Sequence, residues 1–343
     1  EQRADIEKFT KDKELQKEYT QRVFPELLES LRRDTTSGVF LVMANDQPIG
    51  APGDFTGFFL RDSDPVTKAD TNSDLLLERG DKTLARQWGI TLDNSWSPAF
   101  RFQGKGIRES DDFFYEPYTA GMAHTGVDMA SLGYWSMPFI LEDYEMDNHK
   151  MITYSVPLVN DGVIYGVVGT EVSVSYLCNT YFRVQDLNRQ QTAGYAIAVD
   201  NGDGTYENIA GKGNLYDAVQ RENGIFKLES TKHEDLFKVK DSKIGSQEIY
   251  ALFSKMNLYA NNVPYKNTNW VLCGFVAEDS IFSLGDKLYS DILTTIVACA
   301  VLGLVIMSVV IRCVTRPVYR LMDSIRSGIA GLKEFAPSGI QEV

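Results

Sequence analysis

The order of apolar and polar residues predicts an α+β chain that ends in a membrane-spanning helix. In residues 1–33, apolar side chains recur near helical spacing between charged ones, which predicts one long helix kinked at Pro25. Short apolar runs beside Asn, Asp and Gly residues predict strands and hairpins. These runs are residues 38–43 and 57–60, 151–159 and 163–174, 194–199 and 205–206, and 270–276.

Residues 292–311 form the longest apolar run, with twenty residues and no charge. About 20 helical residues cross the roughly 30 Å hydrocarbon core of a bilayer. Arg312 and Arg316 follow the run closely, and basic residues favour the cytoplasmic side of a membrane. We therefore predict that residues 1–291 lie outside the cell and that residues 312–343 lie inside it.

The net charge restricts the possible partners, and the length indicates the number of modules. The net charge is −13, and the residues after the span are net basic, so the outer region is more acidic than the whole chain. An acidic surface repels nucleic acid, which we exclude as a partner. About 290 outer residues are too many for one small core. They predict two modules, residues 38–190 and 191–278, which open with similar strand–turn–strand patterns. Cys178 and Cys273 allow one disulfide, but two buried thiols are the prediction, because a chain this long needs no disulfide.

The two ends of the chain suggest that it is the middle of a longer protein. An outer N-terminal region requires a targeting or membrane segment, and none precedes the apolar run. We expect a first transmembrane helix before residue 1 and an output domain after residue 343.

Three segments of the outer region carry a family resemblance. Residues 115–121 hold a Tyr before small residues, residues 133–139 are rich in aromatic residues, and residues 162–171 form a Gly- and Val-rich strand that ends in Glu171. Together with the long first helix, they resemble the double Cache family, the extracellular sensor domains of bacterial transmembrane receptors. The resemblance covers about residues 1–290. It implies a long N-terminal helix (residues 1–37) and two PAS-like antiparallel-sheet modules, of which the membrane-distal one binds a small molecule.

The segment after the span has a resemblance of its own. Arg316, Pro317 and Val318 open a stretch with apolar residues at Leu321, Ile325 and Ile329, which resembles the first helix of a HAMP linker. Residues 312–343 are therefore expected to be a partial HAMP linker. The linker and the long first helix imply a homodimer. We expect a juxtamembrane helix (residues 279–291), capped by Asp279 or Ser280, to continue through the span as far as Leu332.

The resemblance implies signal transduction, with a histidine kinase or diguanylate cyclase as the favoured output and a chemotaxis receptor as the alternative. A membrane-tethered extracellular enzyme and an adhesion module are the rival classes. The three histidines, His124, His149 and His233, lack metal-ligand spacing to another His or Cys, and neither a nucleophile elbow nor a phosphate-binding loop occurs. We therefore predict no catalytic residue, metal or cofactor for this chain.

Glu171 is the first candidate for ligand recognition. It interrupts a strand of Val and Gly, and burying a carboxylate is costly unless it is paired. Gly166 and Gly169 beside it leave room for a ligand or a neighbouring backbone. In Cache domains that bind amino acids, the acidic residue at the matching place takes the ligand's amine. The alternative is an internal salt bridge from Glu171 to a Lys or Arg.

Aromatic and hydroxyl side chains near this strand are further candidates. Tyr115, Tyr118, Tyr134 and Trp135 are expected either to form an aromatic wall of the pocket or to fill the core. Ser136 and Tyr154 are weaker candidates of the same kind.

One departure from the family pattern concerns the ligand's carboxylate. Members that bind amino acids place Arg and Trp shortly before the Tyr that matches Tyr118, and this chain has Tyr115 and Pro117 there. Arg61, Arg101 and Arg108 are the candidates for a substitute clamp. An amino acid, an amine or a similar polar metabolite all stay open as the ligand.

Overall fold

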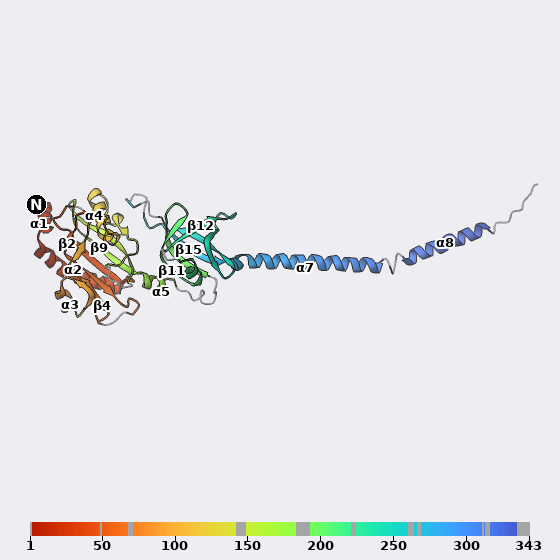
Figure 1. The fold of residues 1–343 in the computed structure, drawn as a ribbon, viewed down its shortest axis with the longest axis horizontal. Coiled ribbons are helices and arrows are strands. Elements are labelled where there is room, and N and C mark those ends of the chain that lie inside the picture. The colour runs from red at the N-terminus through yellow and green to blue at the C-terminus, as the bar shows by residue number, and fades with distance from the viewer. Residues whose placement is uncertain are drawn as a thin grey trace, which may run out of the picture. The chain divides into compact units, whose positions relative to one another are not determined.

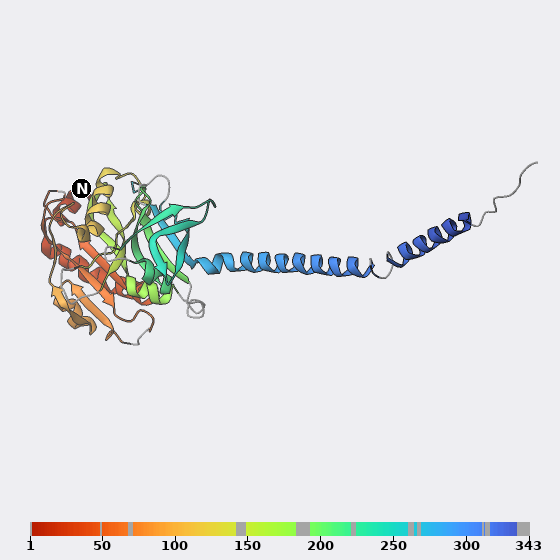
Figure 2. The ribbon, with the colours of Figure 1, turned by 45° about the vertical axis from the view of Figure 1, so that its right-hand side comes forward.

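The structure is a computed structural model of the chain (Figures 1 and 2). It describes residues 2–48, 50–67, 71–141, 149–182, 193–220, 224–259, 264–265, 269–310, 312 and 316–334. The chain divides into two compact units, Glu1–Glu278 and Asp279–Val343. The α+β prediction is confirmed, because the first unit combines helices with two large antiparallel sheets.

The N-terminal segment forms two helices, α1 (Gln2–Phe9) and α2 (Lys13–Arg33). The predicted single helix is therefore wrong in one respect: the break lies at residues 10–12, and Pro25 lies inside α2. The reason is local capping. Asp12 accepts hydrogen bonds from the backbone N–H groups of Glu14 and Leu15, both at 3.1 Å, and so starts a new helix.

The first module is built on a seven-stranded sheet in the order β5-β4-β3-β1-β9-β8-β7. All neighbouring pairs are antiparallel except β4 and β5. Its strands are β1 (Gly38–Met43), β3 (Gly57–Asp62), β4 (Leu75–Arg79), β5 (Thr91–Ser97), β7 (Tyr134–Trp135), β8 (Met151–Asn160) and β9 (Val163–Ser173). A separate ribbon pairs β2 (Gly53–Phe55) with β6 (Phe100–Phe102). The module's other helices are α3 (Lys82–Trp88), η1 (Glu109–Asp111), α4 (Asp112–Ala123) and η2 (Met129–Leu132).

The two faces of this sheet carry different cores. Phe24, Leu28 and Leu31 of α2 pack with the alternate β1 residues Val39, Leu41 and Met43. On the other face, Phe40 and Val42 pack with phenylalanines from the β2–β6 ribbon and α4. Because both faces are covered, all six residues of β1 are buried.

The second module follows α5 (Val174–Thr180) and is an antiparallel sheet, as predicted, which closes on itself as a barrel. Its strands are β10 (Ala193–Asp200), β11 (Thr205–Lys212), β12 (Ile225–Ser230), β13 (Phe237–Ile244), β14 (Gln247–Lys255) and β15 (Asn269–Ala277). The barrel closes because β10 pairs with β15 as well as β11, and α6 (Asn214–Val219) contributes Leu215 to its apolar core. Cys178 and Cys273 are free thiols; Cys273 is buried and Cys178 is half-buried.

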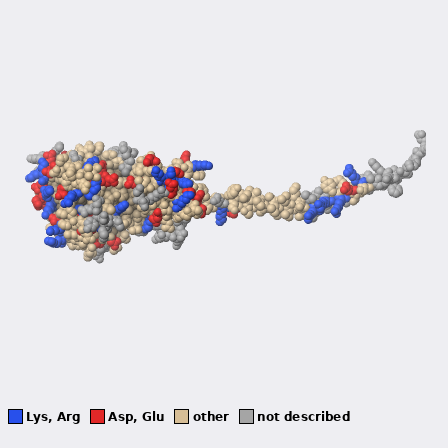
Figure 3. All heavy atoms as spheres, viewed as in Figure 1, with Lys and Arg blue, Asp and Glu red and all other residues tan. Residues whose placement is uncertain are grey.

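The second unit contains α7 (Glu278–Val310), which begins at the last residue of the first unit, and α8 (Arg316–Glu334). The juxtamembrane and apolar segments form one helix, as predicted. Its part Lys287–Val310 is 24 residues long, apolar enough to cross a membrane and wholly unburied. Figure 3 shows this stretch nearly free of charge, with basic side chains following it. Residues 311 and 313–315 lie outside the described residues, so continuity as far as Leu332 stays a prediction.

Candidate functional site

Glu171 belongs to a row of residues that crosses four strands of the first module. Strand register places Thr153 of β8 opposite Glu171 of β9, Glu171 opposite Gly38 of β1, and Gly38 opposite Arg61 of β3. Directly opposed residues share one face of a sheet. Gly38 has no side chain, and a Cβ there would collide with Oε2 of Glu171. Glycine therefore leaves the space between the Glu171 carboxylate and the Arg61 guanidinium.

The Glu171 carboxylate is fully buried, and only one of its two oxygens has a hydrogen-bond partner among the described residues. Its Oε1 accepts a hydrogen bond from Ser37 Oγ at 2.9 Å and lies 3.1 Å from His149 Nε2. Its Oε2 has no hydrogen-bond partner among the described residues. Among the described residues a histidine, in place of the Lys or Arg expected in the alternative, contacts Glu171, and this contact is an ion pair only when the histidine is protonated. Since an unpaired buried carboxylate oxygen is costly, a bound donor at Oε2 would stabilise this site.

Arg61 lies in a second buried group of charges on the same face. Its Nε is 3.1 Å from Glu78 Oε1, and its Nη2 is 3.1 Å from Asp93 Oδ2. Glu78 is the extra residue of a β-bulge, since Leu60 pairs with Leu77 while Phe59 pairs with Arg79. Burial raises the pKa of Glu78 to about 7, against the opposing effect of Arg61.

A cavity of about 480 Å³ opens at the end of these strands. Ser37, Arg61, His149 and Ser173 line one side, and the loop after β3 and helix α5 line the others. Ser37 and His149 are the two residues that contact Oε1 of Glu171, so the carboxylate lies directly behind the cavity wall. This cavity and the buried charges beside it are the candidate site.

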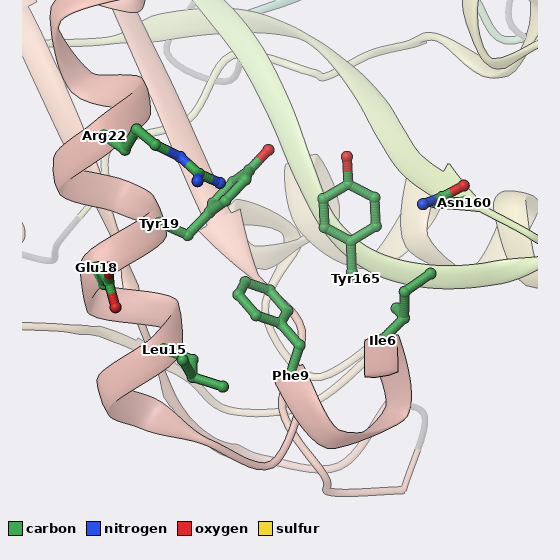
Figure 4. A pocket seen from close by; sticks show the side chains of 8 residues that line it. All are labelled: Ile6, Phe9, Leu15, Glu18, Tyr19, Arg22, Asn160 and Tyr165. Atoms are coloured by element: carbon green, nitrogen blue, oxygen red, sulfur yellow. The ribbon is translucent and has the colours of Figure 1, made fainter. Parts of the chain in front are cut away.

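A second hollow, of about 410 Å³, lies between α1, α2 and the β8–β9 hairpin (Figure 4). Three rings pack edge-to-face there, with centroids 5.5 Å apart for Phe9 and Tyr19 and 6.3 Å apart for Phe9 and Tyr165. Its charged residues, Glu18 and Arg22, are exposed to solvent. No charged side chain is buried around this hollow among the described residues. Unlike the first cavity, it therefore has no buried charge that a ligand would stabilise.

The structure places the predicted aromatic residues in two groups away from Glu171. Tyr115 and Tyr118 belong to α4 and pack in the phenylalanine-rich core. Tyr115 is buried and donates its hydroxyl to Ala51 O at 2.8 Å, while the Tyr118 ring stacks on Phe114. Burial raises the pKa of both phenols.

Tyr134, Trp135 and Tyr154 form the second group, which contacts the second module. The Trp135 ring lies 5.0 Å from Tyr154 and 6.3 Å from Trp270 of β15. Tyr134 packs on Tyr265 at 5.1 Å. Ser136 is closer to the candidate site, because its Oγ accepts a hydrogen bond from Thr153 N at 2.9 Å, and Thr153 lies opposite Glu171. Glu171, Arg61 and Ser136 therefore lie in or beside the row of residues that crosses the sheet. The aromatic wall of a ligand pocket stays a prediction.

Sequence reasoning missed Ser37, Glu78, Asp93 and His149 as members of the site. Glu78 had a usable signal, because it follows three consecutive leucines just as Glu171 interrupts a run of Val and Gly. Among the described residues, no group of three or more His, Cys, Asp or Glu side chains is arranged to hold a metal ion.

Comparison with known proteins gives structural likenesses only. No protein-family model and no curated protein matches the chain. The extracellular domain of a protein described as a histidine kinase, soHK1S-Z6, is 12% identical over 77% of this chain and 79% of its own, with a TM-score of 0.39. The ligand-binding domain of the Pseudomonas aeruginosa PAO1 amino acid chemoreceptor PctB, in complex with L-Arg, is 14% identical over 78% of each chain, with a TM-score of 0.37.

A third similar structure is the ligand-binding domain of the Pseudomonas fluorescens chemoreceptor CtaA in complex with L-isoleucine. It is 14% identical over 82% of this chain and 96% of its own, with a TM-score of 0.35. All three are extracellular or ligand-binding domains of signalling proteins. At these scores they stand as likenesses, and the proposals below rest on contacts within the chain.

Proposed function

We propose that this chain is the sensing and membrane-crossing part of a signal-transduction receptor. Its first unit would bind a small polar molecule outside the cell in the cavity beside Glu171. The observation that carries the proposal is the fully buried Glu171 carboxylate, whose Oε2 has no partner among the described residues. Structural stability alone gives no reason to keep such a group, because an apolar side chain in its place would cost less.

Helix α7 supports the membrane part of the proposal. Apolar side chains such as Leu293, Val301 and Leu304 are at least half exposed along it. A helix that is apolar all round is stable only where another apolar phase covers it, and the segment Lys287–Val310 has the length of a bilayer span. The basic residues Arg316 and Arg320 at the start of α8 favour the cytoplasm for that end.

Signalling then follows as a shift between two states of the receptor. A ligand that binds one arrangement of the first unit more tightly shifts the population toward that arrangement. The change would pass through the barrel, whose last strand β15 leads directly into α7, and on to the partial HAMP linker in a homodimer. A histidine kinase or diguanylate cyclase is the output we favour, with a chemotaxis receptor as the alternative.

The test is a ligand screen on the full chain in detergent. Thermal unfolding would be measured with amino acids, amines and small carboxylates, for the unsubstituted protein and for Glu171→Gln. At a concentration 100 times Kd, a ligand stabilises the folded state by roughly 2.7 kcal/mol, which gives a measurable rise in Tm. We expect at least one hit that Glu171→Gln abolishes.

Glu18→Gln is the matched control, since Glu18 is an exposed glutamate in the other hollow. It should leave every hit unchanged. A hit that binds Glu171→Gln as tightly as the unsubstituted protein would place the ligand elsewhere.

A further inference from the structure

Two arginines beside the candidate cavity, Arg32 and Arg61, are already paired with carboxylates. Arg61 is only 8% exposed and contacts both Glu78 and Asp93. Arg32 of α2 holds Asp74 through two hydrogen bonds of 2.6 and 2.9 Å and lies 3.5 Å from Asp62 Oδ2. Each guanidinium already lies near two carboxylates of the protein, so a ligand carboxylate would compete with them for its positive charge.

Carboxyl groups outnumber cations in this part of the first module. Asp62 and Asp64 line the cavity itself, and burial raises the pKa of Asp62. The carboxyl groups in and around the cavity are those of Asp62, Asp64, Asp74, Glu78, Asp93 and Glu171. The cations are Arg32, Arg61, Arg79, the solvent-exposed Lys150 and, when protonated, His149.

Arg79 is also engaged, because its Nη1 donates to the carbonyl oxygens of Glu78 and Ser95 at 2.6 and 2.9 Å. A molecule that enters the cavity therefore meets an excess of negative charge, and behind the wall formed by Ser37 and His149 lies Glu171 Oε2, an acceptor with no donor among the described residues.

We propose that this cavity selects a small organic cation, an amine or diamine that lacks a carboxylate, and rejects the corresponding zwitterionic amino acid. This inference rests on the proposed function, since it names the ligand class of the same site. The ammonium group would donate to Glu171 in place of, or beside, His149. A carboxylate on the same ligand would face Asp62 and Asp64 while Arg32 and Arg61 already pair with carboxylates of the protein, and like charges at close range disfavour binding.

The protonation of the cluster gives the inference a second signature. Because burial raises the pKa of Glu78 to about 7, this carboxyl becomes negative as the pH rises through neutrality. The added negative charge strengthens the binding of a cation between about pH 6 and about pH 8, as long as the amine keeps its proton.

The experiment uses pairs of compounds that differ by one carboxylate: putrescine and ornithine, histamine and histidine, tyramine and tyrosine. Titration calorimetry on the full chain in detergent would give Kd for each member at both pH values. In at least one pair we expect the amine to bind at least tenfold more tightly than the amino acid, and more tightly at the higher pH.

Asp93→Asn sharpens the test by releasing Arg61. An Asn at this position keeps an oxygen that can accept the hydrogen bonds that Ser95 N and Oγ now donate to Asp93 Oδ1, both at 2.8 Å, so strand β5 should hold its shape. The preference for the amine should fall at least tenfold in this variant. Glu78→Gln serves the same purpose through the other ion pair, and Arg101→Gln, on an exposed ion pair with Asp54, is the control.

The outcomes separate the two proposals. If an amino acid binds more tightly than its amine and Glu171→Gln abolishes that binding, the sensor function stands and the cation inference is overturned. If no pair binds, or if Glu171→Gln leaves all binding intact, both fall.

Discussion

The two modules of the first unit differ in whether charged side chains are buried in them. The first module buries charged side chains within its sheet, among them Arg61, Glu78 and Glu171. In the second module the core is apolar, and among the described residues Ser242 is its only buried polar side chain. Buried charges contribute little to stability compared with apolar groups of the same size. The contrast is consistent with the proposal that the first module retains charge for recognition, whereas the barrel is stabilised mainly by burial of apolar side chains.

The largest expected effect comes from breaking the apolar core of the barrel. Phe275 of β15 is buried and packs edge-to-face on Phe226 at 5.6 Å. We expect Phe275→Ala to lower the free energy of unfolding by about 3–5 kcal/mol, since it removes transfer energy and leaves a cavity. Urea unfolding followed by circular dichroism would measure the change.

Leu252→Ala on the exposed outer surface of the same barrel is the control and should change the free energy of unfolding by less than about 0.5 kcal/mol. Equal effects of the two substitutions would mean that the barrel core is not tightly packed.

The second prediction tests the buried charges of the first module. Arg61→Ala leaves Glu78 and Asp93 without their cation, and removing one partner of a buried pair costs about 3–5 kcal/mol. Replacing both partners, as in Arg61→Met with Glu78→Leu, should recover most of that loss. Chemical denaturation of the single and double variants would show it, and a double variant as unstable as Arg61→Ala would contradict a charge-based cost.

These two regions also show what sequence patterns can and cannot predict. The β8–β9 hairpin was predicted to within one residue at each end, because alternation along its strands and the Asn160-Asp161-Gly162 turn are local signals. Asp161 and Gly162 have φ values of 50° and 74°, as a tight hairpin turn requires. The break at residues 10–12 had a local signal too, the Asp12 cap, which the stronger expectation of a kink at Pro25 obscured.

The candidate site was only partly predictable. A single charge in an apolar strand identified Glu171, but its partner Ser37 is 134 residues away and reaches it only through the pairing of β1 with β9. Tyr134 and Trp135 were grouped as one wall although neighbouring residues of a strand point to opposite faces. Their different partners, Tyr265 and Trp270, follow from that alternation.

The third prediction concerns pH and again separates the modules. The pKa of Glu78 is raised from 4.5 to about 7, so the folded state binds its proton more tightly than the unfolded state. The stabilisation is therefore complete below about pH 4.5 and is lost as the pH rises to about 7, which amounts to roughly 3 kcal/mol.

Glu78→Gln should remove most of this slope in a plot of unfolding free energy against pH. The slope that remains is expected from Asp62 and from Asp112, whose pKa burial raises to about 6. An unchanged slope in Glu78→Gln would show that Glu78 is ionised throughout this range.

The smallest expected effect comes from a hydrogen bond that connects the two modules. Tyr259, just after β14, accepts a hydrogen bond from the backbone N of Trp135 at 3.0 Å through its hydroxyl. Tyr259→Phe leaves that N–H without its partner and should cost about 1 kcal/mol of unfolding free energy.

If this contact also couples the modules, the same substitution in a Glu171→Gln background will cost a different amount, because energies at linked sites do not add. A non-additivity above about 0.5 kcal/mol in this double-mutant cycle would support a physical connection from the buried carboxylate, through Thr153 and Ser136, to the barrel. Strict additivity would mean that this contact does not couple the two modules. Any coupling would then have to pass through α5, which connects them in the chain.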